Sequence, residues 1–356
     1  MIRKAKKTAM ESEILEQPKV IKNLIDKYKD AELNLPENVE KIILVASGSS
    51  YHCARFSADL LGNIAGIEAR AIYSSEFNLK TVFPHDKNTL YVFITQSGET
   101  KDTVEALKRV NQGFVDKNCE RYYLDTLAIT NCEDSTIWKN SKYQINCYAG
   151  EENSIAATKS FTAEMFCVLM AALVLTKRKG QNINSYLDSL EKLPEVIEST
   201  LELRKQIKQI AGKLAHKKYI VVTADGISYS IAKETALKIK ETSYKNVNAI
   251  YLGEFMHGHV AVLNNKSSLI YISVNNIANS AVENLQKIKK DYNPQLFVIG
   301  KHSKAIPFDY SISKDCDNDI HQMFSNVVII QLIAFEIAKK LKRNIDKPKG
   351  LHKVVI

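Results

Sequence analysis

Short apolar runs alternate with amphipathic segments along most of this chain. The runs have the length of buried strands, and between several of them apolar positions recur three or four apart, the spacing typical of helices. The runs are 42–46, 90–95, 126–130, 219–223, 269–274 and 296–299. In segment 103–110, for example, Val104, Leu107 and Val110 mark one helical face. Alternating strands and helices predict an α/β protein with parallel sheets and right-handed crossovers.

One stretch of sequence occurs twice, half the chain apart. Residues 48–55 (GSSYHCAR) and 226–233 (GISYSIAK) each follow an apolar run and precede helical spacing. Each copy reads as a strand, a tight Gly/Ser turn and a helix, which is the opening unit of an α/β domain. We therefore predict two domains of the same type, each an α-β-α sandwich with a parallel sheet flanked by helices.

The repeat and the segments around it divide the chain into five predicted regions. These are a leading helix and entry segment (1–40), a first domain (41–180), a connecting helical segment (181–215), a second domain (216–340) and a C-terminal tail (341–356). The connection is predicted from the polar stretch 180–185 and the helical spacing over 187–214. Pro18 is predicted to lie near the start of the leading helix.

Length and composition agree with two buried cores. The 356 residues are 45% apolar with 7 prolines, which excludes a disordered chain. The longest apolar stretches, 165–176 and 327–335, are shorter than a membrane-spanning segment, so we predict core helices and no membrane partner. Residues 1–20 mix basic and acidic side chains without the apolar stretch of a secretory signal, and we expect a cytoplasmic protein.

The charge and the cysteines narrow the class of ligand. A net charge of +9 favours anionic partners, but it is dispersed and accompanies no nucleic-acid-binding motif, so we expect phosphorylated metabolites and no nucleic acid. The six cysteines show no metal-ligand spacing, and we expect no metal and no cofactor. The dinucleotide and P-loop motifs are absent, which excludes those two kinds of site.

Two hydroxyl-rich turns follow two of the predicted strands. Residues 95–100 (TQSGET) place three hydroxyls and a glycine where a strand gives way to a helix, and residues 47–50 (SGSS) follow the first strand. Free amides and the helix dipole suit an anion at such a position. Ordinary N-capping also explains serine and threonine there. Because ligands of open parallel sheets bind at the carboxyl ends of strands, two such turns favour one small phosphate ester.

Six motifs, in order along the chain, carry a resemblance to a known family. They are 48–50 (GSS), 95–100 (TQSGET), 156–162 (AATKSFT), 237–244 (LKIKETSY), 253–258 (GEFMHG) and 346–353 (DKPKGLHK). From Glu13 to the C-terminus the chain resembles the isomerase half of glucosamine-6-phosphate synthase (glutamine:fructose-6-phosphate aminotransferase), a tandem of two sugar isomerase (SIS) domains. The resemblance implies that fold and a hexose 6-phosphate or aminohexose 6-phosphate as substrate.

The resemblance also implies roles for particular residues. It implies that the phosphate is held by Ser50, Thr95, Gln96, Ser97 and Thr100, and that the sugar lies against Gly48, Ser49, Ala156, Ala157 and Thr158. Glu241 resembles the carboxylate that moves a proton between C1 and C2, with Lys238 beside it. His257 resembles the histidine that opens the sugar ring from the neighbouring subunit of a homodimer. Lys353 resembles the tail lysine that can form an imine with the open-chain sugar.

These residue types suit such chemistry. Moving a carbonyl between C1 and C2 needs one base that removes and returns a proton, which a carboxylate in a partly dry cleft can do. Lys238 and Glu241 lie three apart on a predicted helix, hence side by side, although a surface ion pair explains this spacing equally. A lysine on a mobile tail can form an imine and close over the site.

The largest departure from the family concerns its glutaminase domain. That domain, with its N-terminal cysteine, has no counterpart before the resemblance begins. We therefore expect a deaminase-isomerase that converts glucosamine 6-phosphate and water to fructose 6-phosphate and ammonia. The alternative in the same class is the isomerase subunit of a glutamine-dependent transaminase served by a separate glutaminase subunit.

Smaller departures from the family leave the identity of the sugar substrate undetermined. Ala157 stands where the synthase has a serine near the sugar hydroxyls, and His259 replaces a proline. Since a lost buried hydroxyl changes which sugar is held, galactosamine 6-phosphate or a fructosamine 6-phosphate is an alternative substrate. A non-catalytic phosphosugar sensor is a further alternative, against which Glu241, His257 and Lys353 together argue.

Overall fold

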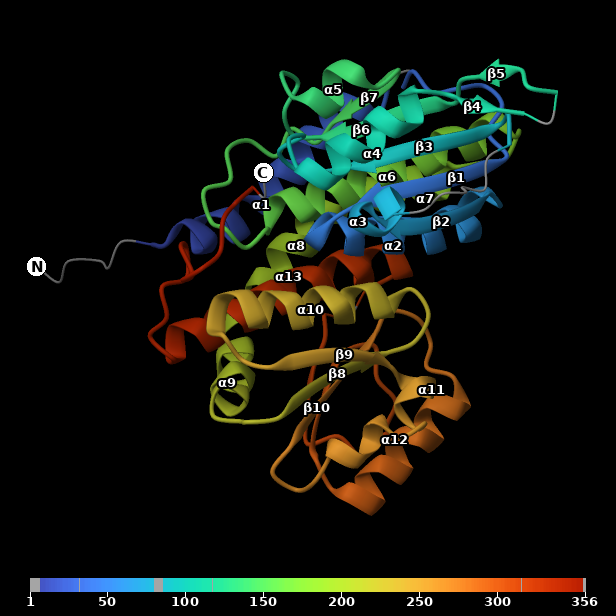
Figure 1. Cartoon of the computed structure of the whole chain (residues 1–356). Coiled ribbons are helices and arrows are strands. Elements are labelled where there is room, and N and C mark those ends of the chain that lie inside the picture. Colours follow the sequence, from blue (N-terminus) through green and yellow to red (C-terminus); the bar gives the residue numbers. More distant parts are fainter. Residues whose placement is uncertain (1–6, 32, 80–85, 117, 315, 355–356) are drawn as a thin grey trace, which may run out of the picture. The chain divides into compact units, whose positions relative to one another are not determined.

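The computed structural model describes residues 7–31, 33–79, 86–116, 118–314 and 316–354 (Figure 1). The chain folds into two compact units, each with a five-stranded sheet. The N-terminal unit consists mainly of Val20–Glu151 and Lys159–Glu191, and the C-terminal unit consists of the described residues up to Lys19, Glu152–Thr158 and Lys192–Lys353. The division falls within α1 (Ala9–Tyr28), whose first half belongs to the C-terminal unit.

The sheet of the N-terminal unit is parallel throughout. Its strands lie in the order β2 (Glu68–Tyr73), β1 (Lys41–Ala46), β3 (Thr89–Ile94), β6 (Asp125–Thr130) and β7 (Tyr143–Asn146). The buried strands β1, β3 and β6 lie where the apolar runs predict them. The sequence did not reveal β2 or β7, because β2 is largely solvent-accessible with charged residues in it and β7 has only four residues.

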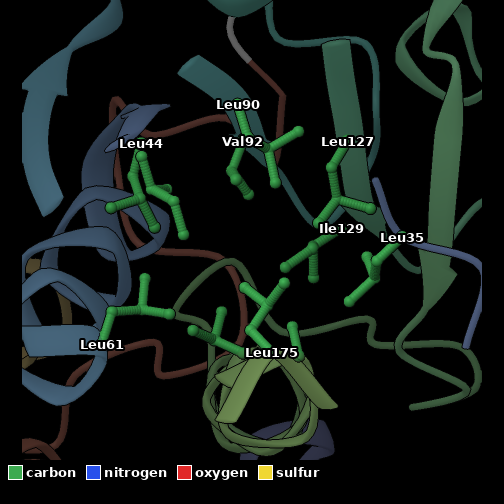
Figure 2. Close-up of a pocket in the computed structure, with 11 residues that line it drawn as sticks. Leu35, Leu44, Leu61, Leu90, Val92, Leu127, Ile129 and Leu175 are labelled. Atoms are coloured by element: carbon green, nitrogen blue, oxygen red, sulfur yellow. The ribbon is translucent and has the colours of Figure 1, made fainter. Parts of the chain in front are cut away.

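Helices flank this sheet and complete its core. They are α2 (Gly48–Ala65), α3 (Ser74–Leu79), α4 (Lys101–Asn111), α5 (Thr136–Asn140), α6 (Lys159–Arg178) and α7 (Asn184–Glu191). A short antiparallel pair, β4 (Phe114–Val115) with β5 (Arg121–Tyr122), stands apart from the sheet. Figure 2 shows strand residues such as Val92 and Leu127 pointing toward Leu175 of α6 around an apolar cavity of about 10 Å³. Such a cavity holds about one water molecule at most and no substrate.

The sheet of the C-terminal unit repeats this topology. Its strands lie in the order β12 (Tyr310–Ile312), β11 (Gln295–Gly300), β10 (Ser268–Ser273), β8 (Ile220–Ala224) and β9 (Val247–Tyr251), again all parallel. The helices are α8 (Leu193–Leu201), α9 (Arg204–Ala215), α10 (Ser228–Ser243), α11 (Leu252–Phe255), α12 (Asn279–Tyr292) and α13 (Asp319–Lys340), with a 3₁₀ turn at His259–Val262. In both units the first strand lies between the second and third strands of its sheet. This confirms the tandem α/β fold predicted from the repeated turn.

Helix α1 differs from the prediction at its proline. Pro18 lies inside α1 and not near its start. A proline inside a helix lacks the N–H that would bond the carbonyl four residues earlier, here that of Ile14. The side-chain amide of Gln17, which is buried, donates to the Ile14 carbonyl oxygen at 3.0 Å. The side chain therefore takes the place of the missing backbone donor.

The helical spacing predicted over 187–214 is divided among three helices, α7, α8 and α9. Pro194 lies in the first turn of α8, where no backbone donor is needed. A helix continuing from α7 through Pro194 would lose a hydrogen bond and clash with the preceding turn. The proline thus divides the predicted segment.

Within the described residues, two helices are long and apolar enough to cross a membrane. They are α6 and α13, of 20 and 22 residues. Both helices extend beyond their apolar centres, so the apolar stretches alone underestimate the helix lengths. Their burial decides the matter: 94% of the apolar window of α6 and 100% of that of α13 lie inside the fold. This is the burial of core helices, as predicted.

Candidate functional site

The two hydroxyl-rich turns lie at one edge of the N-terminal sheet. β1 and β3 pair in parallel with Ala46 opposite Ile94, so turns 47–50 and 95–100 each begin directly after a paired strand end. The strand order also reverses here, because β2 lies on one side of β1 and β3 on the other. Such a switch point is where open parallel sheets bind ligands.

The hydroxyls of the second turn do not serve as helix caps. Thr100 is the N-cap residue of α4, yet its side chain makes no capping hydrogen bond. Instead, Thr95 Oγ1 and Thr100 Oγ1 lie 3.1 Å apart, and Ser97 Oγ accepts a hydrogen bond from the Glu99 amide at 3.2 Å. The Gln96 carbonyl accepts a hydrogen bond from the Asn131 amide at 3.1 Å. Ordinary N-capping therefore does not account for the threonines of this turn.

Close packing fixes the shape of this turn. Gly98 has φ +67°, and a Cβ there would lie 2.0 Å from Ser135 Oγ. The Gly98 carbonyl accepts a hydrogen bond from the Ile137 amide at 3.2 Å. The Glu99 carboxylate accepts from the Thr136 amide at 2.6 Å and from its hydroxyl at 2.9 Å. The turn is thus tied to the start of α5, and only glycine fits at position 98.

Ser50 already uses its hydroxyl proton within the fold. Ser50 Oγ donates to Oε1 of Glu164, a buried residue of α6, at 2.8 Å. Gly48 and Ser49 open α2, whose N-cap residue Ser47 makes no side-chain capping bond. For Ser50 to donate to a phosphate, as the resemblance implies, its hydroxyl must turn away from Glu164. No local sequence pattern predicts this competing carboxylate, which lies 114 positions away.

In the C-terminal unit, α10 carries a buried lysine between two carboxylates. Lys238 Nζ lies 2.6 Å from Glu241 Oε2 and 3.4 Å from Glu234 Oε1. The Lys238 side chain is fully buried and that of Glu234 is 1% exposed, whereas that of Glu241 is 20% exposed. Burial alone would lower the pKa of Lys238, but the charges of Glu234 and Glu241 outweigh it and raise the pKa above its ordinary value. This is not a surface ion pair: Lys238 is a fixed cation, and Glu241 is its solvent-accessible partner.

A second ion pair joins the tail to loop 152–158. Lys353 Nζ donates to Oε2 of Glu152 at 2.6 Å and to the Ser154 carbonyl at 2.7 Å. The Glu152 side chain is fully buried, and that of Lys353 is 26% exposed. Oε1 of Glu152 accepts from the Thr158 amide at 2.9 Å and from its hydroxyl at 3.2 Å. Against the effect of burial, Glu152 also helps to raise the pKa of Lys238, so the two pairs form one electrostatic cluster.

The start of α1 anchors both this loop and the tail. The Glu13 carboxylate accepts hydrogen bonds from the amide of Ser154 at 3.1 Å and from its hydroxyl. The carboxylate of Asp346, in the tail, accepts from the amides of the first two residues of α1 at 2.8 and 3.0 Å. The Asp346 carbonyl accepts from the Ile155 amide at 3.1 Å. Loop 152–158 and the tail are therefore held in fixed geometry within the C-terminal unit.

The remaining predicted residues are placed as follows. Ala156 is buried and Ala157 is partly buried in loop 152–158, next to Thr158. His257 follows α11 and is exposed. Among the described residues, no hydrogen bond or ion pair joins the His257 ring to Glu241 or Lys238. The C-terminal unit thus brings Glu241, Lys238, Lys353 and Thr158 into one cluster and leaves His257 outside it.

Sequence reasoning missed two residues of this cluster. Glu234 lies one helical turn before Lys238, and this spacing alone could have revealed it. Glu152 contacts a lysine 201 positions away, a pairing that no local pattern reveals. In the described part of the chain, no group of three His, Cys, Asp or Glu side chains is arranged for a metal ion. The carboxylates of the cluster contact lysine ammonium groups instead.

The fold and its turns define a tandem α/β protein whose first sheet ends in hydroxyl-rich turns and whose second unit carries a lysine–carboxylate cluster. The family model described as SIS domain matches the chain twice, at residues 37–174 and 213–338. The chain therefore belongs to the SIS domain family, as its motifs predict.

Similar proteins extend the match over nearly the whole chain. The glutamine–fructose-6-phosphate aminotransferase [isomerizing] of Haemophilus ducreyi is 29% identical over 366 residues, and that of Nostoc sp. is 30% identical over 368. Each alignment covers 97% of this chain but only 58% of the relative, so the chain spans less than two thirds of the length of these relatives. It is homologous to their C-terminal isomerase part.

Solved structures agree with the fold. The C-terminal domain of glucosamine-fructose-6-phosphate aminotransferase from Francisella tularensis has a TM-score of 0.88 at 25% identity, covering 96% of this chain and 99% of that one. Glucosamine-6-phosphate deaminase from Thermotoga maritima shares the fold, with a TM-score of 0.77 at 19% identity, covering 98% of this chain and 99% of that one.

Proposed function

We propose that the chain is a phosphosugar isomerase that interconverts glucosamine 6-phosphate and water with fructose 6-phosphate and ammonia. In this proposal the turns at 47–50 and 95–100 hold the phosphate, and Glu241 moves a proton between C1 and C2. Lys353 forms an imine with the open-chain sugar. Membership of the SIS family and the names of its aminotransferase relatives support a phosphosugar substrate.

The observation that carries the proposal is that the Glu241 carboxylate is accessible to solvent yet fixed by a buried lysine. The carboxylate is 20% exposed and is held at 2.6 Å by a lysine that cannot reach solvent. A base that shuttles one proton between adjacent carbons must be accessible to the substrate yet fixed in position. Although burial acts to lower the pKa of Lys238, the charges of Glu234 and Glu241 raise it, so Lys238 stays charged beside Glu241.

Ammonia release tests the reaction directly. The purified chain is supplied with glucosamine, galactosamine and fructosamine 6-phosphates in turn, and ammonia and the keto sugar phosphate are measured. We expect turnover of glucosamine 6-phosphate, and formation of the amino sugar from fructose 6-phosphate with ammonium. Faster turnover of either other sugar would reassign the substrate, and no turnover with any of the three would contradict the deaminase proposal. Binding without turnover would favour a sensor.

The second candidate is the isomerase part of a glutamine-dependent transaminase. It is favoured by one observation, the alignment of 97% of the chain with aminotransferases. Under this candidate, amino sugar forms from fructose 6-phosphate only when a glutaminase partner supplies the ammonia. Adding free ammonium with and without a glutaminase distinguishes the two, because a free-standing deaminase responds to ammonium alone.

Removing hydroxyls from the second turn tests the phosphate assignment. The double substitution Ser97→Ala and Thr100→Ala should raise KM for hexose 6-phosphates by at least about tenfold, since hydrogen bonds to a charged group are worth more than neutral ones. The substitution should change kcat less than KM. Exposed Ser185, at the start of α7, provides the control Ser185→Ala, which should leave KM unchanged. An unchanged KM in the double variant would remove the phosphate from this turn.

Two further features of the proposal stay predictions. His257 is proposed to act in ring opening as part of a homodimer, and its exposure on the C-terminal unit agrees with a role at a subunit contact. A cytoplasmic location is also proposed, in line with the phosphosugar substrates proposed above.

A further inference from the structure

Glu152 is a fully buried carboxylate that pairs with a partly exposed lysine. Its side chain is fully buried, one oxygen accepts two hydrogen bonds from Thr158, and the other contacts the Lys353 ammonium at 2.6 Å. Removing a carboxylate from water is costly unless it is paired and hydrogen-bonded, and here both conditions are met. Of the two partners Thr158 and Lys353, the lysine carries a charge and reaches solvent, being 26% exposed.

The pairing is compatible with chemistry at the lysine nitrogen. When an ammonium group condenses with a carbonyl, the C=O bond is replaced by C=N, two of its protons leave with the oxygen as water, and the product is a protonated imine. One positive charge resides on the nitrogen before and after the reaction. A carboxylate that pairs with the ammonium therefore pairs equally with the protonated imine, and apart from the released water no proton is lost or gained overall.

We infer that Glu152 is the fixed counter-ion of Lys353, first in its ammonium form and then in the protonated imine that it forms with the open-chain sugar. This inference rests on the proposed function, since it requires an imine at Lys353. Glu152 acts here as a positioning residue. It touches the lysine nitrogen and not the reacting carbons, and it places a negative charge beside the positive nitrogen. A protonated imine draws electrons from the adjacent carbon and so eases removal of its proton by Glu241.

The geometry explains why this carboxylate can stay in place. Thr158 holds one of its oxygens, and loop 152–158 is anchored through Ser154 to Glu13. The lysine, in contrast, lies at the end of a tail and can move by rotation of its long side chain. The anion is thus rigid and the cation adaptable, as expected if the cation has to reach the substrate and return.

The test is reductive trapping of the protonated imine. Protein is incubated with fructose 6-phosphate and cyanoborohydride, which reduces protonated imines, and the adduct on Lys353 is measured by peptide mass spectrometry. Glu152→Gln should lower the trapped fraction about tenfold or more, because a charge-assisted hydrogen bond is lost. Glu152→Asp, which keeps the charge, should stay within about threefold of the wild type. The matched control is Glu151→Gln, at an exposed neighbouring carboxylate, and it should trap as the wild type does.

The outcomes separate this inference from the proposed function. Thermal melts establish whether each variant folds. If Glu152→Gln does not fold, trapping in Glu152→Asp still tests the inference. The counter-ion role would be overturned if folded Glu152→Gln trapped as much adduct as the wild type, or if folded Glu152→Asp trapped none. Either result would leave the proposed isomerase function intact. Turnover by a wild type that forms no adduct on Lys353 would also overturn it. Absence of turnover with every sugar phosphate would remove the proposed function and this inference together.

Discussion

Replacing Glu241 with glutamine is expected to lower kcat by about 10²- to 10⁴-fold while the variant still binds hexose 6-phosphate, because a general base typically contributes that much to the rate. The amide keeps an oxygen that can accept the hydrogen bond from Lys238, now 2.6 Å from the carboxylate, so the local structure should persist. The decisive measurement is kcat from steady-state kinetics together with substrate affinity from calorimetry.

The control for this experiment is a carboxylate of the same unit without a place in the cluster. Glu283 is exposed on α12, and Glu283→Gln should leave both kcat and affinity unchanged. Turnover by Glu241→Gln comparable to that of the wild type would refute the proton-transfer role. A loss of affinity equal to the loss of kcat/KM would indicate instead that Glu241 binds the substrate.

Replacing Lys238 with methionine is expected to destabilise the protein by about 3–5 kcal/mol, because it removes the cation from beside the buried carboxylate of Glu234. Glu234 is 1% exposed and lies 3.4 Å from the lysine nitrogen, so its carboxylate cannot turn to water instead. Urea unfolding would measure the difference in the free energy of unfolding. Adding Glu234→Gln to the variant should recover part of the loss, since it removes the buried negative charge that Lys238 balances in the wild type.

The pH dependence of this effect follows from the direction of the Lys238 pKa. Although burial acts to lower that pKa, the charges of Glu234 and Glu241 raise it above its unfolded value. A raised lysine pKa gives stability that is fully present below the unfolded value of about 10.4 and lost only as the pH rises through the folded value. The deficit of Lys238→Met should therefore be constant from about pH 6 to 9.

An exposed lysine on the same helix, Lys240, provides the control for the Lys238→Met substitution. Lys240 lies on the same helix two residues later and is exposed. Lys240→Met should change the free energy of unfolding by less than about 0.5 kcal/mol, as is usual for surface substitutions. Equal destabilisation by the two substitutions would contradict the buried ion-pair cluster.

The sequence predicts the parts of the fold that local pattern determines. The buried strands β1, β3, β6, β8, β10 and β11 are continuous apolar runs, and the Gly/Ser turns after β1 and β8 mark the repeat. The short or exposed strands carry no such pattern, so β2, β7, β9 and β12 were missed. The position of Pro18 was wrong because a buried glutamine side chain compensates for the missing donor.

In the candidate site, too, local spacing predicts some of the contacts and tertiary packing determines the others. Lys238 and Glu241 are neighbours on one helix, so spacing alone places them together, but only the structure reveals that the lysine is buried. The pairing of Glu152 with Lys353 and the hydrogen bond from Ser50 to Glu164 join residues 201 and 114 positions apart. Such contacts depend on tertiary packing, which periodicity does not encode.

The exchange of segments between the two units limits how the chain can be divided. Loop 152–158 belongs to the C-terminal unit although the chain on either side of it belongs to the N-terminal unit. A gene fragment that ends before residue 192 would therefore carry away the loop that receives Lys353, and one that begins there would lack both the loop and Glu13. Domain shuffling with another member of this family should accordingly exchange 152–158 and the start of α1 along with the C-terminal half.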